Sequence, residues 1–545
     1  MSRVLLISYP GYPSTPAQLV ANPWLAHLAG ALLEANHEPL ALDFGTVAMM
    51  RRLFPEALTE QLKGMVGGMR GAGGMDEQAL AVLGELSAQL EAHQAQVEQQ
   101  LVGEVVSQAE RFGPQVILLE LGDGDGFAGT LQMAAALRER FPDAIIAAGG
   151  RKAAWFRHRI LHTAPQFTAI ITADPEDAAM DLADVAAGEM ALGEVAGLVY
   201  RDGASLAESP RLDFALGDLP IPSYDVDIYP AMAGDEKIKM GIVTESRGCN
   251  NRCAFCLHPY EDGARQRLVP AERVVDIMAA LQERYGMSVF RLCGASTPGE
   301  LLHEIAQEIL RRGLQVQYNS FGHFRSAKPE HFATLAQSGL YSLFFGLESG
   351  SQRILDKAVH KGIKLGRVRE SIAACKSAGI FTAASMIVPL PFDTPETLAE
   401  SLAFVTDVKP DAVPLQFPGL MPGTRWAQEP WKYNLEIEDV EAYFAGFMDY
   451  RFKLLFPPPF WTPLPYKVNG MGFQEFTKVT MWFAGQLEQA GILTNLSHTL
   501  AAIAQSAGMP PRQLRDAAQL WFVTGDAEAA GEMVARANRA MVGGR

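Results

Sequence analysis

Three of the five cysteines in this 545-residue chain lie close together, in the segment ESRGCNNRCAFCLHP at 245–259. Cys249, Cys253 and Cys256 follow the spacing C-x-x-x-C-x-x-C, and Phe255 directly precedes the third cysteine. Three thiolates on one short loop can hold three corners of a cubane 4Fe–4S cluster and leave one iron without a protein ligand. That open iron could chelate the amino and carboxylate groups of a small molecule. The motif therefore predicts an iron–sulfur centre with an open coordination position.

A structural zinc ion is the alternative interpretation of the same segment. Cys249, Cys253, Cys256 and His258 could supply a tetrahedral site with three sulfur ligands and one nitrogen ligand. However, a single residue separates Cys256 from His258, which is an awkward spacing for two ligands of one ion. The sequence also offers no second ligand knuckle elsewhere. The spacing therefore favours the cluster over zinc.

The overall composition limits the classes of partner and the compartment. Hydrophobic residues make up 48% of the chain and charged residues 20%, as in ordinary globular proteins. The net charge of -16 cannot neutralise phosphates, so we expect no nucleic-acid partner. We find no apolar run of about 18 residues and no signal-peptide pattern, so we expect no membrane contact. An odd number of cysteines, three of them clustered, does not fit a disulfide framework, and we expect a cytoplasmic protein.

The first of two series of alternating strands and helices predicts a Rossmann-like domain over 1–203. Short apolar runs separated by amphipathic stretches are typical of a parallel sheet that is covered on both faces. Residues 56–112 interrupt the alternation and predict a helical insertion with a Gly/Met-rich loop at 67–75. The predicted strands lie at 4–8, 38–43, 115–120, 144–148 and 168–172.

The second series predicts a partial (β/α)6 barrel over 237–430, after a Pro- and Asp-rich linker at 204–236. Ligands of such barrels bind at the carboxyl ends of the strands, which is where the cysteine loop falls. Residues 431–545 predict a mainly helical C-terminal domain. The expected strands lie at 238–244, 288–293, 315–321, 340–347, 381–388 and 412–417, with helices at 270–285, 300–312, 366–378 and 395–407 between them.

The cysteine motif at the mouth of this barrel resembles that of the radical S-adenosylmethionine (SAM) superfamily. The stretch FGLESGSQRILDKAVHKG (345–362) resembles the family's G-x-E-S-G stretch. The turn CGAST (293–297) takes the place of the family's Gly-Gly-Glu turn but departs from it. MIVPLPFDTPET (386–397) and FPGLMPGTRW (417–426) resemble the family in position. The resemblance implies SAM contacts at Phe255, Gly294, Ser296, Thr297, Glu348 and Ser349.

The order of the domains resembles that of cobalamin-dependent radical SAM enzymes, the class B methyltransferases, over roughly residues 1–430. The resemblance places a corrin at the strand ends of the first domain, against Tyr9, Pro10, Gly122, Asp123, Gly149, Gly150 and Asp174. Many cobalamin proteins ligate cobalt with a histidine in a D-x-H-x-x-G loop, and no D-x-H occurs here. His27 and His37 are the nearest histidines to that position, and neither is well placed. We therefore expect no histidine ligand to cobalt.

These resemblances imply three cofactors and a radical reaction. A 4Fe–4S cluster, reduced by a flavodoxin or ferredoxin, would split SAM into methionine and a 5′-deoxyadenosyl radical. The radical would take hydrogen from an unactivated carbon of a small-molecule or natural-product substrate, in biosynthesis. The substrate radical would then take a methyl group from methylcobalamin, in a dry cavity between the domains. Candidates for a substrate wall are Cys293, Trp461 and Tyr466, whereas Cys375 lies on a predicted helix and is expected to be inert.

Three alternative functions share some of these cofactors or domains but differ in the reaction. Some relatives use cobalamin for oxidative cyclisation or ring rearrangement without net methylation, and product mass separates the two outcomes. A non-catalytic cobalamin or cluster sensor would not cleave SAM. A methylthiotransferase acting on transfer RNA would bring further cysteines in its first domain, and this chain has none before Cys249.

Overall fold

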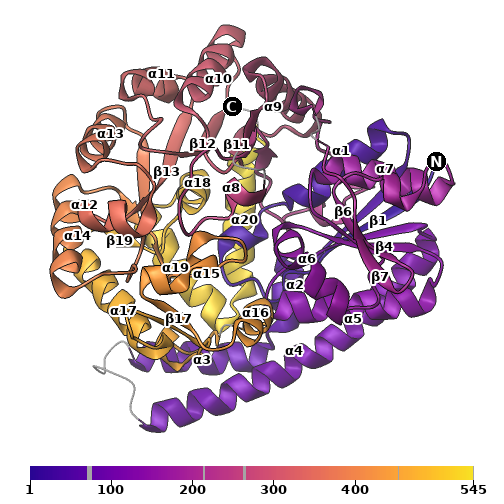
Figure 1. The fold of residues 1–545 in the computed structure, drawn as a ribbon, viewed down its shortest axis with the longest axis horizontal. Coiled ribbons are helices and arrows are strands. Elements are labelled where there is room, and N and C mark those ends of the chain that lie inside the picture. The colour runs from indigo at the N-terminus through magenta and orange to yellow at the C-terminus, as the bar shows by residue number, and fades with distance from the viewer. Residues whose placement is uncertain (70–76, 213–214, 262–264, 452, 544–545) are drawn as a thin grey trace. The chain divides into compact units, whose positions relative to one another are not determined.

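The computed structural model describes residues 1–69, 77–212, 215–261, 265–451 and 453–543 (Figure 1). The chain forms two compact units. The first comprises 1–239 with 445–457 and 517–535, and the second comprises the remaining described residues from 240 onward. The segment 431–545, predicted as one helical domain, is therefore divided between the two units. Helical periodicity marks an apolar face but does not say which core that face joins.

The sheet of the first unit contains all five predicted strands. Their order is β2-β1-β3-β4-β5, with every pair parallel, as the short apolar runs predict. An antiparallel hairpin, β6 and β7, extends the sheet beyond β5 and places β7 inside the range predicted as linker. The strands are β1 (Arg3–Ser8), β2 (Glu38–Asp43), β3 (Val116–Glu120), β4 (Ile145–Gly149), β5 (Ala169–Ile171), β6 (Leu198–Asp202) and β7 (Ser205–Glu208).

Helices cover both faces of this sheet (Figure 1). α1 (Pro23–Glu34) and α7 (Pro175–Ala187) pack against each other on one face, while α4 (Glu77–Phe112) packs with α5 (Asp125–Arg140) on the other. α1 starts at Asn22, whose side chain accepts hydrogen bonds from the backbone of Trp24 and Leu25, and Pro23 occupies the first helical position. The unit also contains α2 (Val47–Leu53) and α6 (Arg151–Thr163).

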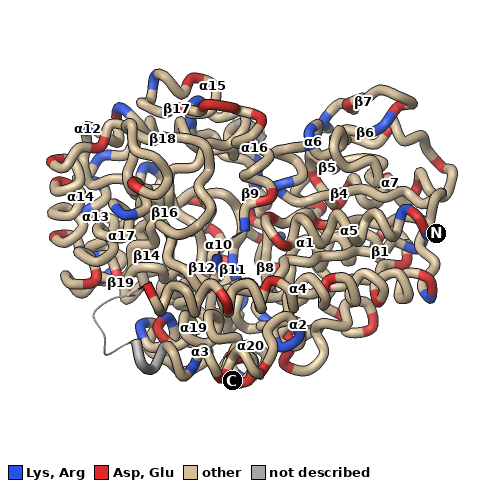
Figure 2. Tube along the Cα trace, turned by 90° about the horizontal axis from the view of Figure 1, so that it is seen from below, with Lys and Arg blue, Asp and Glu red and all other residues tan. Residues whose placement is uncertain are grey.

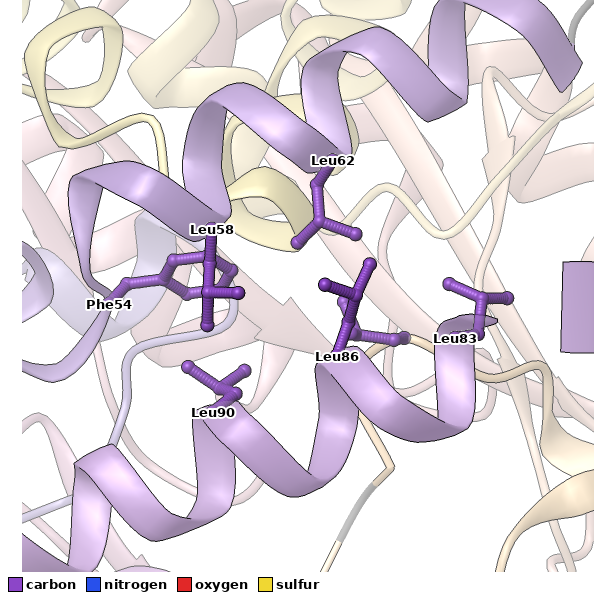
Figure 3. Close-up of a cluster of buried hydrophobic side chains, with 7 residues drawn as sticks. Phe54, Leu58, Leu62, Leu83, Leu86 and Leu90 are labelled. Atoms are coloured by element: carbon purple, nitrogen blue, oxygen red, sulfur yellow. The ribbon is translucent and has the colours of Figure 1, made fainter. Parts of the chain in front are cut away.

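The predicted helical insertion consists of α3 (Glu56–Met69) and α4 (Figure 3). Leucines at helical spacing on both helices form a buried cluster, as the 3.6-residue period requires. Most of the predicted Gly/Met-rich loop lies outside the described residues. The core of the cluster is formed by Phe54, Leu58, Leu62, Leu83, Leu86, Leu90 and Leu455.

Shortening one of these leucines should destabilise the first unit. Leu86 is 5% exposed, and Leu86→Ala removes its contacts with the other leucines and leaves a cavity, which typically costs about 2–5 kcal/mol. Val82, on the same helix, is 40% exposed, so Val82→Ala serves as the matched control. Thermal unfolding should show a lower Tm for Leu86→Ala only. Equal effects of the two substitutions would contradict this packing.

The second unit is built on parallel strands in the order β19-β15-β14-β13-β12-β11-β8. The six predicted barrel strands are all present, with the sixth split into β15 and β16, and β19 is an additional strand that follows them in the sequence. The strands are β8 (Gly241–Val243), β11 (Val289–Leu292), β12 (Gln317–Gly322), β13 (Leu340–Glu348), β14 (Phe381–Ile387), β15 (Ala412–Val413), β16 (Leu415–Gln416) and β19 (Leu493–Thr494).

Helices alternate with these strands, as predicted for the barrel. They are α9 (Ala271–Tyr285), α10 (Gly299–Arg312), α11 (Phe332–Gln337), α13 (Leu365–Ser377) and α14 (Pro395–Val408). The later part of the chain is mainly helical and also contains a small antiparallel pair, β17 (Leu435–Ile437) with β18 (Tyr466–Val468). Its helices are α16 (Val440–Met448), α17 (Phe473–Gln489), α18 (His498–Ser506), α19 (Pro511–Thr524) and α20 (Ala527–Met541).

Charged residues are spread over both units. Figure 2 shows acidic and basic residues interspersed along each trace. Within the described part of the chain, no helix combines the length and apolar character needed to cross a bilayer.

Candidate active site

The cysteine loop lies at the carboxyl end of β8, the first strand of the barrel. It follows β9 (Ser246–Gly248), which pairs antiparallel with β10 (Gln266–Leu268) and so fixes both ends of the loop. Cys249 and Cys253 are buried, and Cys256 is partly exposed. The three predicted cluster residues therefore share one anchored loop at the barrel mouth.

Contacts from two distant segments hold the middle of this loop. The backbone N–H of Ala254 donates to the carbonyl of Val359 at 2.9 Å, and the Ala254 carbonyl accepts from Trp426 at 3.1 Å. The Phe255 ring packs on the Trp426 indole, with centroids 5.5 Å apart. Phe255 therefore anchors the loop through an aromatic contact, in addition to its predicted place at the SAM site.

Burial of the cysteine loop favours the uncharged thiol forms of Cys253 and Cys256. Burial raises the pKa of Cys253 to about 11, and the positive charge of Lys361 partly opposes this shift. Burial also raises the pKa of Cys256 to about 12, while the backbone N–H of His258 acts in the opposite direction. Thiolate ligation therefore requires the positive charge of a bound metal centre.

The donor set fits an iron–sulfur cluster better than a single metal ion. Among the described residues, no group of three His, Cys, Asp or Glu side chains converges on a point that could hold one ion. A zinc site needs such convergence, whereas cluster cysteines each bind a different iron. The Asn251 amide donates to Cys249 Sγ at 3.3 Å, and hydrogen bonds to sulfur are among the features that tune cluster sites.

The turn after β11 is organised around a carboxylate that the sequence analysis missed. The Gly294 N–H donates to Glu245 Oε2 at 2.9 Å, and the Thr297 hydroxyl donates to Glu245 Oε1 at 2.7 Å. Any Cβ at Gly294 would come within 2.2 Å of the same carboxylate, so the turn requires glycine there. Ser296 is tied through its carbonyl to Gln266 of β10 at 2.6 Å.

Glu245 is completely buried, and burial raises its pKa even though its hydrogen bonds act in the opposite direction. The family's turn would carry its acidic residue within 293–297, whereas in this chain the acid is Glu245, which lies between β8 and β9. A polar residue directly after an apolar strand, four positions before Cys249, was the available signal. Glu245 therefore holds the predicted SAM-binding turn in place.

The end of β13 carries a strained glutamate in a buried ion pair. Glu348 has a φ of 68°, which is unusual for a residue with a side chain, and a register shift of the strand accompanies it. Its carboxylate accepts from Lys361 Nζ at 2.6 Å, and Lys361 also donates to the Gly346 carbonyl at 2.7 Å. Ser349 Oγ lies 3.1 Å from Ser401 Oγ. The structure therefore places Glu348 at a strand end, paired with a cation.

Lys361 is a second residue that the sequence analysis missed. Burial acts to lower its pKa, but the charge of Glu348 raises it overall, with a smaller contribution from Cys253 in its thiolate form, so Lys361 stays cationic. A π-helical turn, Leu355–Val359, precedes it and is hydrogen-bonded to the cysteine loop through Val359. π-helical turns are frequent at functional sites because they reposition the residues that follow. The local signal was only the stretch AVHKG, whose geometry depends on contacts with the distant loop.

The three candidates for a substrate wall occupy different environments. Cys293 is partly exposed at the end of β11, with its Sγ 3.4 Å from the Thr244 hydroxyl. Trp461 is half-buried, edge-on to Phe417 at 6.3 Å. Tyr466 is 5% exposed, and its hydroxyl donates to the Pro418 carbonyl at 2.6 Å. Of the three, Cys293 is the one at a barrel strand end.

In the first unit, the carboxyl ends of β1 and β3 form the point at which the strand order reverses. Ligands of doubly wound sheets bind at such a point. Glu120, at the end of β3, accepts hydrogen bonds from Ser8 of β1 at 2.8 Å and from the Asn22 side chain at 2.5 Å. Burial raises the Glu120 pKa. Glu120 and Asn22 are polar groups at the predicted corrin face that the sequence analysis did not name.

The predicted corrin-face residues divide into two groups. Gly149 and Gly150 lie beside Trp24 and Glu120: a Cβ on Gly149 would come within 2.5 Å of the Trp24 ring, and one on Gly150 within 3.0 Å of Glu120. Tyr9, by contrast, is 1% exposed and donates to Glu98 Oε1 at 2.8 Å, so its side chain is bound beneath the inserted helix α4.

The remaining predicted corrin-face residues lie on loops after the strands. Asp123 is exposed and pairs with Lys152 at 3.1 Å, in the loop after β3 that also contains Gly122. Pro10 is partly exposed after β1, and Asp174 is buried at the start of α7.

The two histidines nearest the first strand are committed to α7. His27 Nδ1 lies 3.5 Å from Glu176, and His37 Nε2 lies 3.3 Å from Asp184. Both histidines are buried. Their side chains therefore face α7 rather than the loop after β1.

Comparisons with known proteins agree with this architecture. Residues 244–405 match the family model of the Radical SAM superfamily. An uncharacterized methyltransferase of Pyrococcus horikoshii is 24% identical over 53% of this chain and 62% of its own length. The cytidylyl-2-hydroxyethylphosphonate methyltransferase of Streptomyces wedmorensis is 24% identical over 53% of this chain and 60% of its own length. The chain thus spans less than two thirds of the length of these two relatives.

A solved structure shares the fold over nearly the whole chain. The radical SAM methyltransferase TsrM of Kitasatospora setae, with cobalamin and a [4Fe–4S] cluster bound, has a TM-score of 0.63 and 14% identity. The alignment covers 97% of this chain and 100% of that one. At this identity the likeness establishes a common fold, and the predicted fold class is confirmed.

Proposed function

We propose that this chain, whose residues 244–405 form a radical SAM domain, is a cobalamin-dependent C-methyltransferase that acts on an unactivated carbon of a small molecule. The observation that carries the proposal is the anchored three-cysteine loop at the mouth of a parallel barrel. The same chain contains a doubly wound sheet with polar groups and glycines at its switch point. TsrM, which shares the fold, is a methyltransferase with cobalamin and a cluster bound.

Each part of the site has a role in this reaction. Cys249, Cys253 and Cys256 would hold the cluster, and the hydrogen bond from Ala254 to Val359 keeps their loop in place. Glu245 fixes the turn at Gly294 that would receive the methionine moiety of SAM. When bound, the cluster and cobalamin supply one-electron cleavage of SAM and a transferable methyl group.

The Lys361–Glu348 pair adds buried charges at the barrel mouth, where a zwitterionic ligand such as the methionine moiety would bind. In the first unit, the absence of side chains at Gly149 and Gly150 makes room for Trp24 and Glu120 at the strand ends, where the corrin would bind. Glu120, which Asn22 and Ser8 hold in place, offers a carboxylate oxygen to an amide group at the edge of a corrin. A flavodoxin or ferredoxin would supply the electron.

Product analysis tests the methyl transfer. With its substrate, each turnover should consume two SAM molecules and yield one 5′-deoxyadenosine and one S-adenosylhomocysteine, with a product heavier by one CH₂. Substrate-dependent 5′-deoxyadenosine without S-adenosylhomocysteine would favour cyclisation or ring rearrangement instead. A protein that binds the cofactors but never cleaves SAM would be a sensor.

Electron paramagnetic resonance of bound cob(II)alamin should show cobalt hyperfine lines without a threefold nitrogen splitting. We expect the nucleotide tail of the cofactor to be pulled away and no histidine to replace it, because His27 and His37, the nearest histidines, are paired with Glu176 and Asp184. Without a nitrogen ligand, bound cobalamin would be reduced more readily to the form that accepts a methyl group from SAM. Triplets that persist in a His27→Ala variant would mean that the nucleotide tail of the cofactor still coordinates cobalt.

A further inference from the structure

The strand that the sequence analysis missed brings a histidine into the barrel. β19 pairs parallel with β15, so its carboxyl end lies at the same edge of the sheet as the ends of the other barrel strands. α18 begins directly afterwards at His498, with Ser497 accepting a hydrogen bond from the Leu500 backbone at 3.2 Å. α18 packs against β12, β13 and β14 (Figure 1).

Strand register gives the position of His498 along the barrel. Asn319 of β12 pairs with Ser342 of β13, and Phe321 pairs with Phe344 one step nearer the strand ends, on the same face of the sheet. The His498 carbonyl accepts from Asn319 Nδ2 at 3.4 Å and from Ser342 Oγ at 3.2 Å. Its ring packs on Phe321 and Phe344, with centroids 4.5 and 5.2 Å away. The imidazole therefore lies nearer the barrel mouth than its own carbonyl.

Three polar atoms at this position are buried without partners among the described residues. They are both ring nitrogens of His498, which is 2% exposed, and Oδ1 of Asn319, which is 0% exposed. Because a carbonyl can only accept, the Asn319 nitrogen must face the His498 carbonyl, and its oxygen is the unpaired atom. Each unpaired buried polar atom costs about 1–3 kcal/mol, so three together call for a partner.

The surroundings define what that partner can be. Burial and the nearby charge of Arg291 both lower the His498 pKa, so the ring is neutral and has one donor and one acceptor nitrogen. The unpaired Asn319 oxygen needs a donor. Phe321 and Phe344 are partly exposed, so solvent reaches the aromatic walls beside the histidine.

We propose that His498 and Asn319 bind an uncharged group of the methyl acceptor that both donates and accepts hydrogen bonds, such as a primary amide or a hydroxyl. An apolar or aromatic part of the same molecule packs on Phe321 and Phe344. The inference rests on the proposed function and names the substrate class of that site. A carboxylate does not fit, because it cannot donate to the Asn319 oxygen.

Benzamide and benzoate are matched probes for this site, since only the first can donate a hydrogen bond. Cluster-loaded protein with ¹³C-labelled histidine is titrated with each, and the His498 signal is identified by its loss in His498→Phe. Benzamide should shift that signal and benzoate should bind more weakly. Isothermal titration calorimetry gives the Kd in variants, including His498→Phe, where the signal is absent. In His498→Phe and in Asn319→Leu the benzamide Kd should rise about fivefold, the worth of about one hydrogen bond. His331, directly before α11, does not belong to the proposed site. His331→Phe is therefore the control and should bind benzamide as the wild type does.

Thermal unfolding separates a binding role from a structural one. His498→Phe removes two unpaired polar atoms and keeps a ring of similar shape, so Tm without probe should be unchanged or higher. A clearly lower Tm, an unmoved His498 signal, or equal affinity for benzoate would overturn the proposal. Absence of the cluster and of SAM cleavage in the wild type would instead overturn the proposed function, whatever benzamide does.

Discussion

Replacement of Cys249, Cys253 and Cys256 together with alanine should abolish the cluster and all 5′-deoxyadenosine formation. Anaerobically reconstituted wild-type protein should carry about four irons on this loop, as three-thiolate ligation of a cubane implies. The variant should carry none, because the three thiols that would ligate its irons are absent. Iron and sulfide content, with the visible absorbance of the cluster, measure the effect.

Cys375→Ala is the matched control for this variant. Cys375 is buried on α13, where burial raises its pKa to about 12, and it does not belong to the loop. It should leave iron content and SAM cleavage unchanged. Stoichiometric zinc in anaerobically purified wild-type protein, without iron–sulfur absorbance, would show that the loop is a structural zinc site.

Glu348→Ala should weaken SAM binding strongly and also destabilise the protein. The substitution removes a predicted SAM contact and leaves Lys361 as an unpaired cation that is 9% exposed. Breaking a buried ion pair by removing one partner costs about 3–5 kcal/mol, because the remaining charge stays desolvated. SAM affinity of the cluster-loaded protein and its Tm should therefore both fall, while iron content stays unchanged.

The double variant Glu348→Ala/Lys361→Met separates the two effects. Removing both charges should restore much of the Tm, since no uncompensated charge remains. SAM affinity should stay low, because the site has lost its charged groups. Recovery of SAM affinity along with Tm would mean that the pair stabilises the fold without contacting the ligand.

Strand positions were largely predictable because buried parallel strands are short apolar runs, and such runs stand out between amphipathic helices. The cysteine loop was predictable because its ligands are adjacent in sequence. β19 was missed because two residues, Leu493 and Thr494, carry no periodicity, and its pairing with β15 depends on the tertiary fold. His498 was missed for the same reason.

Side-chain direction was the other feature that the sequence could not supply. Tyr9 follows β1 as predicted, but its side chain is bound by Glu98 of the inserted helix, a partner 89 positions away. Glu245 and Lys361 likewise owe their roles to contacts with distant segments, the turn at Gly294 and the cysteine loop. The local sequence pattern predicts that a residue lies at a strand end. The direction of its side chain, in contrast, depends on the packing of the whole unit.

The central claim is that one chain both cleaves SAM by one-electron reduction and passes the methyl group of SAM to bound cobalamin. The most direct measurement incubates reduced, cluster- and cobalamin-loaded protein with SAM carrying a deuterated methyl group. The account predicts 5′-deoxyadenosine and S-adenosylhomocysteine in the same sample, with the labelled methyl group recovered on the cobalamin. Reduced, fully loaded protein that forms neither product, or that forms 5′-deoxyadenosine while the cobalamin stays unlabelled, would contradict it.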